Sequence, residues 1–132
     1  MLVEKESSSG VVGKHIYGNL YGCDPKVLSN LRFLRNVVQD AVKVASMNLV
    51  ELKAWKFGGE RGGVSVIALV VESHIALHTW PSYKYATLDI YTCGDNSDPE
   101  RAFEMVCKTL KPDRVVKYFA DRSSIPQGIV SP

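Results

Sequence analysis

The stretch that decides the fold begins with Val64-Ser65-Val66-Ile67-Ala68-Leu69-Val70-Val71 and runs directly into Glu72-Ser73-His74-Ile75-Ala76-Leu77-His78-Thr79-Trp80-Pro81. Its first part is rich in Val and Ile, which predicts a central strand buried on both faces. Its second part contains four polar or ionisable residues in the seven positions from Glu72 to His78. We expect a second strand at Ile75 to Trp80, and the four polar or ionisable residues appear where the first strand ends.

The segments before this stretch predict a strand, a helix and another strand. Apolar residues recur at helical spacing from Leu34 to Ala45, which predicts an amphipathic helix that ends near Ser46. Ser29 or Asn30 could cap its first turn. Alternation from Leu49 to Lys56 predicts a half-buried strand. We also expect a first strand or extended arm within residues 11–21.

The segments after it predict a strand, a helix and a final strand. Asp98 followed by Pro99 is typical of a helix start, and Pro112 ends that helix. Strands are expected at 87–91 and 114–120, with turns at 58–63 and 81–84. This succession of strands and two helices, with hairpin-like links, predicts the α+β class, as one domain over residues 1–132. We expect a two-layer sandwich, with an antiparallel β-sheet and helices on one face.

Composition and charge exclude some classes of protein. The 132 residues are 45% hydrophobic and carry a net charge of +2, with acidic and basic residues interspersed. This gives no basic footprint for nucleic acid. No apolar run has the length of roughly 20 residues that a membrane span needs. The N-terminus from Met1 to Gly10 is polar and without an apolar signal core, so we expect a cytoplasmic protein with a frayed start.

The cysteines and histidines do not form a metal or disulfide pattern. Cys23, Cys93 and Cys107 are an odd set without CxxC spacing, which argues against a disulfide framework or a zinc site. His74 and His78 lie in a segment that reads as strand rather than helix, so we expect no metal. The glycine-rich segment 58–63 lacks the GxGxxG and GK[ST] patterns of phosphate loops and precedes a strand, so it reads as a hairpin connection.

Ser73 and Cys93 are two possible nucleophiles, twenty residues apart in the sequence, and the residues alone allow several interpretations. Ser73 follows the buried strand, and Cys93 is followed by Gly94, which leaves a thiol accessible at a strand end. A hydrolase that uses Ser73 or Cys93 as nucleophile with a histidine base is one interpretation. The GxSxG elbow of serine hydrolases is absent, which leaves a Cys-His hydrolase. The plain alternative is a strand terminus with a satisfied polar cluster and a core thiol.

Beyond these physical patterns, the chain resembles the prokaryotic S-adenosylmethionine decarboxylase family. The resemblance rests on Glu72-Ser73-His74, His78-Thr79-Trp80-Pro81 and Thr92-Cys93-Gly94, together with Gly63-Val64-Ser65. It covers the chain from about Gly13 to Ser124. The combined motifs are specific to this pyruvoyl-dependent family.

The resemblance implies that the chain is a proenzyme which cleaves itself between Glu72 and Ser73. Ser73 would become a covalent pyruvoyl cofactor that forms a Schiff base with the substrate, in an α chain of residues 73–132 beside a β chain of residues 1–72. In the family pattern His78 is the processing base and Ser65 assists it. Cys93 would be the proton donor in decarboxylation, because a thiol is mostly protonated at neutral pH and can act as an acid.

The substrate implied is an amino acid of polyamine biosynthesis. The family usually has a glutamate after Thr-Trp-Pro that is thought to hold ribose hydroxyls, whereas this chain has Ser82. This serine and three further segments make the chain resemble an archaeal branch of the family, which decarboxylates L-arginine to agmatine. The segments are Gly18-Asn19-Leu20-Tyr21, Lys53-Ala54-Trp55 and Phe57-Gly58-Gly59. S-adenosylmethionine is the alternative substrate, and a processing-dead regulatory subunit is a further alternative.

Several residues could contact the substrate side chain. A guanidinium group favours a carboxylate such as Glu51, Asp89 or Glu60, although solvated strand and loop charges are the simpler interpretation of each. Trp55 could stack on guanidinium or adenine, or could be ordinary sheet packing. A sheet with one helical layer would bury its open face in a partner, and family members are multimers of α and β chains, so we expect a homo-multimer of αβ units.

Overall fold

The computed structural model describes residues 10–125 and has the predicted two-layer α+β architecture. Its six antiparallel strands lie in the order β2-β3-β4-β5-β1-β6. They are β1 (Lys14–Tyr21), β2 (Leu49–Phe57), β3 (Gly63–Val70), β4 (Ser73–Trp80), β5 (Tyr85–Thr92) and β6 (Arg114–Asp121). The helices are α2 (Pro25–Leu28), α3 (Leu31–Val44) and α4 (Pro99–Leu110), with a 3-10 turn, η1, at Pro81–Tyr83.

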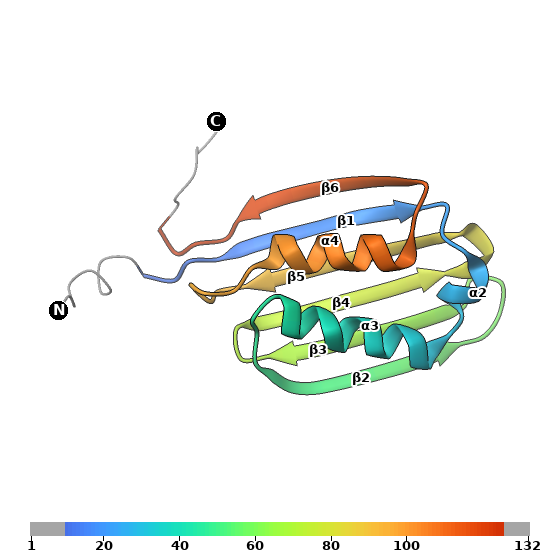
Figure 1. Ribbon diagram of the computed structural model, residues 1–132, viewed down its shortest axis with the longest axis horizontal. Coiled ribbons are helices and arrows are strands. Elements are labelled where there is room, and N and C mark those ends of the chain that lie inside the picture. The colour runs from blue at the N-terminus through green and yellow to red at the C-terminus, as the bar shows by residue number, and fades with distance from the viewer. Residues whose placement is uncertain (1–9, 126–132) are drawn as a thin grey trace.

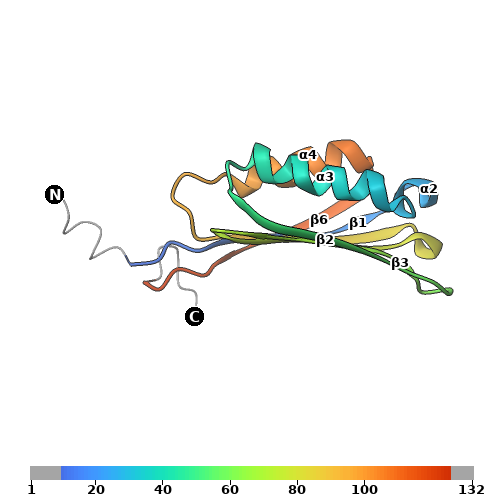
Figure 2. The same cartoon turned by 90° about the horizontal axis from the view of Figure 1, so that it is seen from below.

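The two long helices cover one face of the sheet and leave the other bare (Figures 1 and 2). α3 lies over the β2–β3 side and α4 over β5 and β1. The core between the layers is formed by one face of each helix and by alternate residues of the inner strands, among them Leu34, Val38, Val66, Leu77, Leu88 and Phe103. Burial of this apolar surface is the main stabilising term for the fold.

Local signals start both long helices where they were predicted. The Asn30 side chain accepts a hydrogen bond from the Phe33 N–H at 3.0 Å, and the Asp98 side chain accepts one from the Arg101 N–H at 3.1 Å. Each of these bonds satisfies one of the backbone donors that a helix start leaves open. Asn30, rather than Ser29, is therefore the cap of α3.

A buried threonine ties the short helix α2 to the sheet. The Thr79 hydroxyl donates to the Leu28 carbonyl at 2.8 Å and accepts from the Val64 N–H at 2.9 Å. Thr79 is 4% exposed, so both bonds are protected from water. This explains the threonine in the His78-Thr79-Trp80-Pro81 motif as an anchor of the fold.

The prediction that β3 is buried on both faces is wrong for the single chain. Val64, Val66, Ala68 and Val70 are buried under the helices, but Ile67 and Leu69 on the bare face are 38% and 50% exposed. The run is apolar on both sides because alternate residues line two different surfaces. Trp55 and Phe57 of β2 are exposed beside them, which gives the bare face an apolar half.

The frayed start predicted for Met1 to Gly10 lies outside the described residues except for Gly10. Among the helices that the structure describes, none has the length and apolar character of a membrane span.

Candidate active site

The serine of the predicted cleavage site lies in a strained backbone. Val70 pairs with Ser73, so Val71 and Glu72 form a two-residue turn between β3 and β4. Ser73 has a φ of 152°, a region that side chains other than glycine rarely adopt. Such a conformation costs about 1–3 kcal/mol and persists only where neighbouring contacts hold it. The strained residue is therefore the one that directly follows the predicted scissile bond.

The carbonyl before this serine is held by a donor from the residue that follows strand β5. The Cys93 N–H donates a 2.9 Å hydrogen bond to the Glu72 carbonyl oxygen. If a nucleophile added to the Glu72 carbonyl carbon, negative charge would develop on this oxygen. A backbone N–H already in place would stabilise that charge, as the donors of an oxyanion hole do.

The loop that follows β5 fixes this donor and leaves the thiol accessible. The buried Thr92 hydroxyl lies 2.6 Å from the Ser97 hydroxyl and accepts from the Gly94 N–H at 3.1 Å, while Ser97 Oγ donates to the Gly94 carbonyl at 2.8 Å. A Cβ on Gly94 would come within 2.7 Å of Glu72 Cγ, so only glycine allows the loop to pass this closely. Cys93 itself is exposed. Ser73 and Cys93, predicted to act together, are therefore brought together.

The two predicted processing residues form a second pair at a distance from the first. Ser65 Oγ lies 2.8 Å from His78 Nδ1 on adjacent strands. His78 is five residues along β4 from Ser73, which corresponds to about 16 Å at the rise of a strand. An odd separation also places the two side chains on opposite faces of the sheet. Within one chain, the structure does not bring Ser65 and His78 to Ser73.

The bare face between the two pairs carries a charged cluster. Asp89 Oδ1 lies 3.0 Å from His15 Nε2 and 3.3 Å from His74 Nε2. Burial alone would raise the pKa of Asp89, but the hydrogen bonds from His74 and His15 outweigh it and lower that pKa below its ordinary value. His74 and His78 both belong to this face, four residues or about 13 Å apart. No group of three metal-ligating side chains was found among residues 10–125.

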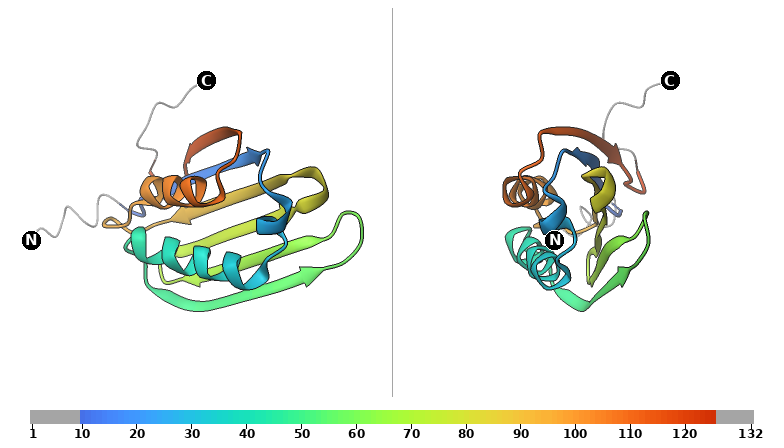
Figure 3. Two further views of the ribbon diagram at one scale, coloured as in Figure 1. Left: turned by 45° about the vertical axis from the view of Figure 1, so that its right-hand side comes forward. Right: turned by 90° about the vertical axis from the view of Figure 1, so that its right-hand side faces the viewer.

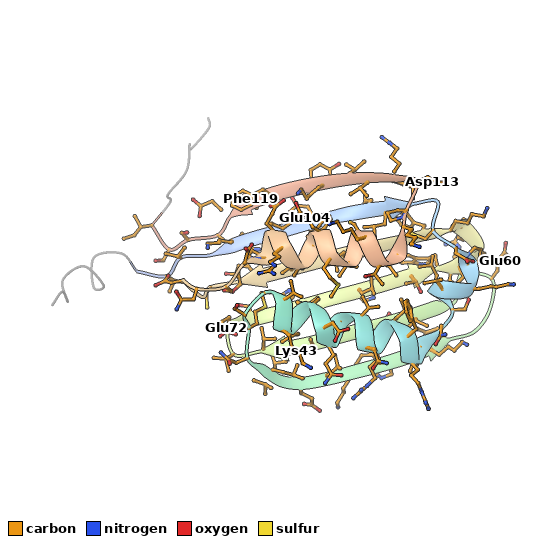
Figure 4. The ribbon with its side chains drawn as sticks, viewed as in Figure 1. Lys43, Glu60, Glu72, Glu104, Asp113 and Phe119 are labelled. Carbon is orange, nitrogen blue, oxygen red and sulfur yellow. The ribbon has the colours of Figure 1, made fainter. Side chains whose placement is uncertain are left out.

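The residues proposed to contact the substrate side chain are spread over the sheet. Trp55 pairs with Ser65 and lines a shallow pocket of about 180 Å³ with Glu51, Lys53, Ile67 and Leu69. Ser82 lies in η1, beyond the end of β4. The labelled Glu60 and Glu72 mark opposite ends of the molecule (Figure 4). The glycine-rich loop and the cleavage site are therefore also apart within one chain.

Four residues take part in ways that were not predicted from the sequence. Asn48 binds the Glu72 carboxylate, Thr92 and Ser97 fix the Cys93 loop, and the backbone of Cys93 contacts the scissile carbonyl. Asn48 and Ser97 are single polar residues in loops without a motif, so only the folded structure reveals their roles. Alternation along 85–92 could have placed Asp89 on one face with Tyr91, but not beside His15.

The donor set fits a pyruvoyl group made from Ser73. Such a group needs a hydroxyl residue whose preceding carbonyl can be activated, and afterwards an accessible acid beside it. The strained Ser73, the Cys93 N–H on the Glu72 carbonyl and the exposed Cys93 thiol meet these requirements at one end of the sheet.

Comparisons with known proteins show which family the chain is similar to. The family model described as S-adenosylmethionine decarboxylase matches residues 14–123. A protein of Hyperthermus butylicus named arginine decarboxylase proenzyme is 59% identical over 116 residues, covering 88% of this chain and 82% of the relative. A protein of the same name from Ignicoccus hospitalis is 54% identical over 121 residues, covering 92% and 84%.

A solved structure extends the agreement from sequence to fold. The crystal structure of the adenosylmethionine decarboxylase from Aquifex aeolicus superposes with a TM-score of 0.79 at 31% identity, covering 92% of this chain and 99% of that one. The predicted fold class and the predicted class of enzyme are both confirmed. The chain belongs to the S-adenosylmethionine decarboxylase family.

Proposed function

We propose that this chain is a proenzyme that cleaves itself between Glu72 and Ser73 and then decarboxylates L-arginine to agmatine and CO2. The observation that carries the proposal is the arrangement at the start of β4. There a strained serine follows a carbonyl held by the Cys93 N–H, beside the exposed thiol of the same cysteine. Cleavage would give a β chain of residues 1–72 and an α chain of residues 73–132.

The cleavage uses only groups of the chain and one water. Ser73 Oγ attacks the carbonyl carbon of Glu72, the C–N bond breaks, and the Ser73 nitrogen takes the hydroxyl proton, leaving an ester. Loss of the Ser73 Cα proton then expels the Glu72 carboxylate from Cβ. The resulting dehydroalanine takes up water and releases ammonia, which leaves a ketone at the start of the α chain. The Cys93 N–H stabilises the negative charge that develops on the Glu72 carbonyl oxygen in the tetrahedral adduct.

Turnover requires an acid next to this ketone. The pyruvoyl group supplies an electrophilic carbonyl that binds the substrate's amino group and accepts the electrons left when CO2 departs. The Cys93 thiol then delivers a proton to the substrate's Cα. General acid catalysis by a positioned side chain typically contributes about 10²–10⁴-fold. The thiol is the exposed one of the chain's cysteines, whereas burial raises the pKa of Cys23 to about 11.

A second copy of the chain supplies what one copy lacks at Ser73. His78 and Ser65 are about 16 Å along the strand from Ser73 and belong to the bare face. The apolar half of that face, with Trp55, Ile67 and Leu69, would be covered if two sheets packed face to face. A two-fold axis between them could bring the His78 end of one copy to the Ser73 end of the other. We therefore propose a homo-multimer of αβ units with composite sites.

The choice of substrate rests on the relatives and on Ser82. Two relatives above 50% identity are named arginine decarboxylase proenzymes, and this chain has no carboxylate directly after Pro81. S-adenosylmethionine is the second candidate, favoured by the solved neighbour at 31% identity. A processing-dead subunit is the remaining alternative and predicts an uncut chain.

Two measurements test the proposal. Mass spectrometry of the purified protein should find two chains that meet at Glu72 and Ser73, with a pyruvoyl group on the second. The processed protein, given carboxyl-labelled L-arginine or S-adenosylmethionine in parallel, should release labelled CO2 from arginine. Release only from S-adenosylmethionine would change the substrate and keep the chemistry, whereas an intact chain with an unmodified serine would refute the proposal.

A further inference from the structure

The turn that precedes the cleavage site is held by a single residue of another loop. Asn48, between α3 and β2, donates its backbone N–H to Glu72 Oε1 at 3.0 Å and its side-chain Nδ2–H to Oε2 at 2.7 Å. Its carbonyl accepts the Val71 N–H at 2.8 Å. Both residues of the two-residue turn, Val71 and Glu72, are therefore bound to Asn48.

Asn48 is itself fixed from both sides of the sheet end. Met47 is 7% exposed in the core and donates its N–H to the Val42 carbonyl at 3.0 Å. The Ala45 carbonyl accepts the Asp98 N–H at 2.9 Å, which joins this loop to the loop that carries Cys93. The loop of Asn48 and the loop of Cys93 both contact Glu72 and are hydrogen-bonded to each other. The turn at Val71 and Glu72 is therefore fixed by two connected loops.

We propose that Asn48 is a positioning residue for self-cleavage, which holds Glu72 so that the scissile carbonyl stays on the Cys93 N–H and Ser73 stays strained. This inference rests on the proposed self-cleavage. Rotation of the Glu72–Ser73 peptide plane would relieve the φ of Ser73 but would remove the carbonyl from the Cys93 N–H. With the Glu72 side chain held by Asn48 and packed on Gly94, that rotation is opposed from both ends of the residue.

The charge of Glu72 strengthens this contact. The hydrogen bond from the Asn48 backbone is the main cause that lowers the pKa of Glu72, followed by a smaller opposing effect of burial and by the Asn48 side chain. The groups around the carboxylate are the two Asn48 donors, its own backbone and the Cys93–Gly94 segment. Among the described residues, no Lys, Arg or His side chain forms an ion pair with Glu72. The carboxylate therefore depends on Asn48 for its compensation.

The first test compares cleavage rates of the full chain. Freshly synthesised protein from a cell-free pulse is followed on denaturing gels for wild type, Asn48→Ala and the matched control Asn36→Ala, which changes an exposed asparagine of α3. We expect Asn48→Ala to cleave about tenfold more slowly or worse, the size of losing one hydrogen bond to a charged group. The Asn36→Ala protein should cleave like wild type. If wild type cleaves and Asn48→Ala keeps its rate, this inference is wrong and the proposed function stands; if wild type stays uncut, the proposed function itself fails.

The second test separates positioning from simple loss of stability. Asn48→Asp places a second carboxylate against Glu72, so the pair repels at neutral pH and regains a hydrogen bond when one carboxyl is protonated. Its cleavage should therefore be slow at neutral pH and accelerate on acidification toward about pH 5. A general loss of stability in acid would slow cleavage instead. In a Glu72→Ala background, Asn48→Ala should cause no additional slowing. A wild-type pH profile for Asn48→Asp, or an undiminished effect of Asn48→Ala without Glu72, would overturn the inference.

Discussion

Ser73 and His78 belong to the same strand but cannot meet in one chain. They are five residues apart on β4, and alternation places their side chains on opposite faces. Figure 3 shows the sheet from its end, with α3 and α4 on one side and the opposite face uncovered. Alternation along β4 places His78 on that bare face. If His78 assists cleavage at Ser73, the two residues must come from different copies.

This relationship predicts complementation between two inactive variants. Ser73→Ala removes the cleavage site and keeps His78, whereas His78→Ala keeps Ser73 and lacks the base. Each variant alone should remain uncut or cleave at least tenfold more slowly than wild type. When the two are co-expressed with different tags, the His78→Ala chain should be cleaved inside the mixed dimer. Tag-specific mass spectrometry of each chain gives the readout, and cleavage of His78→Ala alone at the normal rate would contradict the arrangement.

A charge on the bare face should abolish both assembly and cleavage. Ile67→Lys places an ammonium group in the apolar half of this face, where a packed partner would leave it buried and unpaired. We expect monomers by light scattering and a chain that remains uncut. The control Phe119→Lys changes an exposed residue of β6 on the helix side of the sheet, as its pairing with the buried Ile16 indicates. A monomeric Ile67→Lys protein that cleaves normally would refute the composite site.

Much of the fold could be predicted because its signals are local. The cap at Asp98 with Pro99, the helical spacing before Ala45 and the alternation of β2 each depend on neighbouring residues, and the structure confirms these elements. The environment of the second face of β3 could not be predicted. An apolar residue there can be covered by the same chain or by a partner, and the sequence does not distinguish the two.

Only those residues of the candidate site that belong to sequence motifs were predicted. The motifs identify Ser73, Cys93, Ser65 and His78, but strand spacing alone already separates Ser73 from His78 by about 16 Å. The hold of Asn48 on Glu72 joins residues 24 apart in sequence through a loop without pattern. Contacts of this kind depend on where two loops meet, which only the packed sheet and helices determine.

The strain at Ser73 predicts an inverted effect of glycine. In a strand interior, glycine normally destabilises by about 0.5–1 kcal/mol relative to alanine. At a φ of 152°, the alanine side chain keeps a strain that glycine lacks, so Ser73→Gly should be more stable than Ser73→Ala by about 1 kcal/mol. Both chains remain uncut, so urea unfolding compares them directly. Ala76→Gly in the Ser73→Ala background, at an ordinary strand position, should be destabilising; the same sign at both positions would show that Ser73 carries no strain.

The hydrogen bonds that Asp89 accepts from His74 and His15 should make the folded chain lose stability in acid. The pKa of Asp89 is lowered in the folded chain because the hydrogen bonds from His74 and His15 outweigh burial. A lowered pKa contributes stability above the ordinary value of 3.8, and this contribution disappears as pH falls through the folded pKa. In the Ser73→Ala background, Asp89→Asn should therefore be less stable than its parent at about pH 5, and the difference should shrink toward about pH 2. Urea unfolding at several pH values measures this, and a gap that widens in acid would contradict it.

Replacing the Cys93 side chain should separate self-cleavage from decarboxylation. The backbone N–H of Cys93 contacts the Glu72 carbonyl, and that N–H remains when the side chain is replaced by that of alanine. Cys93→Ala should therefore still cleave and form the ketone, yet release CO2 from arginine at least about 100-fold more slowly, because the proton donor for Cα is missing. Cys107→Ala, which changes the half-buried thiol of α4, serves as the matched control and should turn over normally. Normal turnover by Cys93→Ala would exclude the thiol as the acid, and an uncut Cys93→Ala chain would mean that the side chain, not the backbone, assists cleavage.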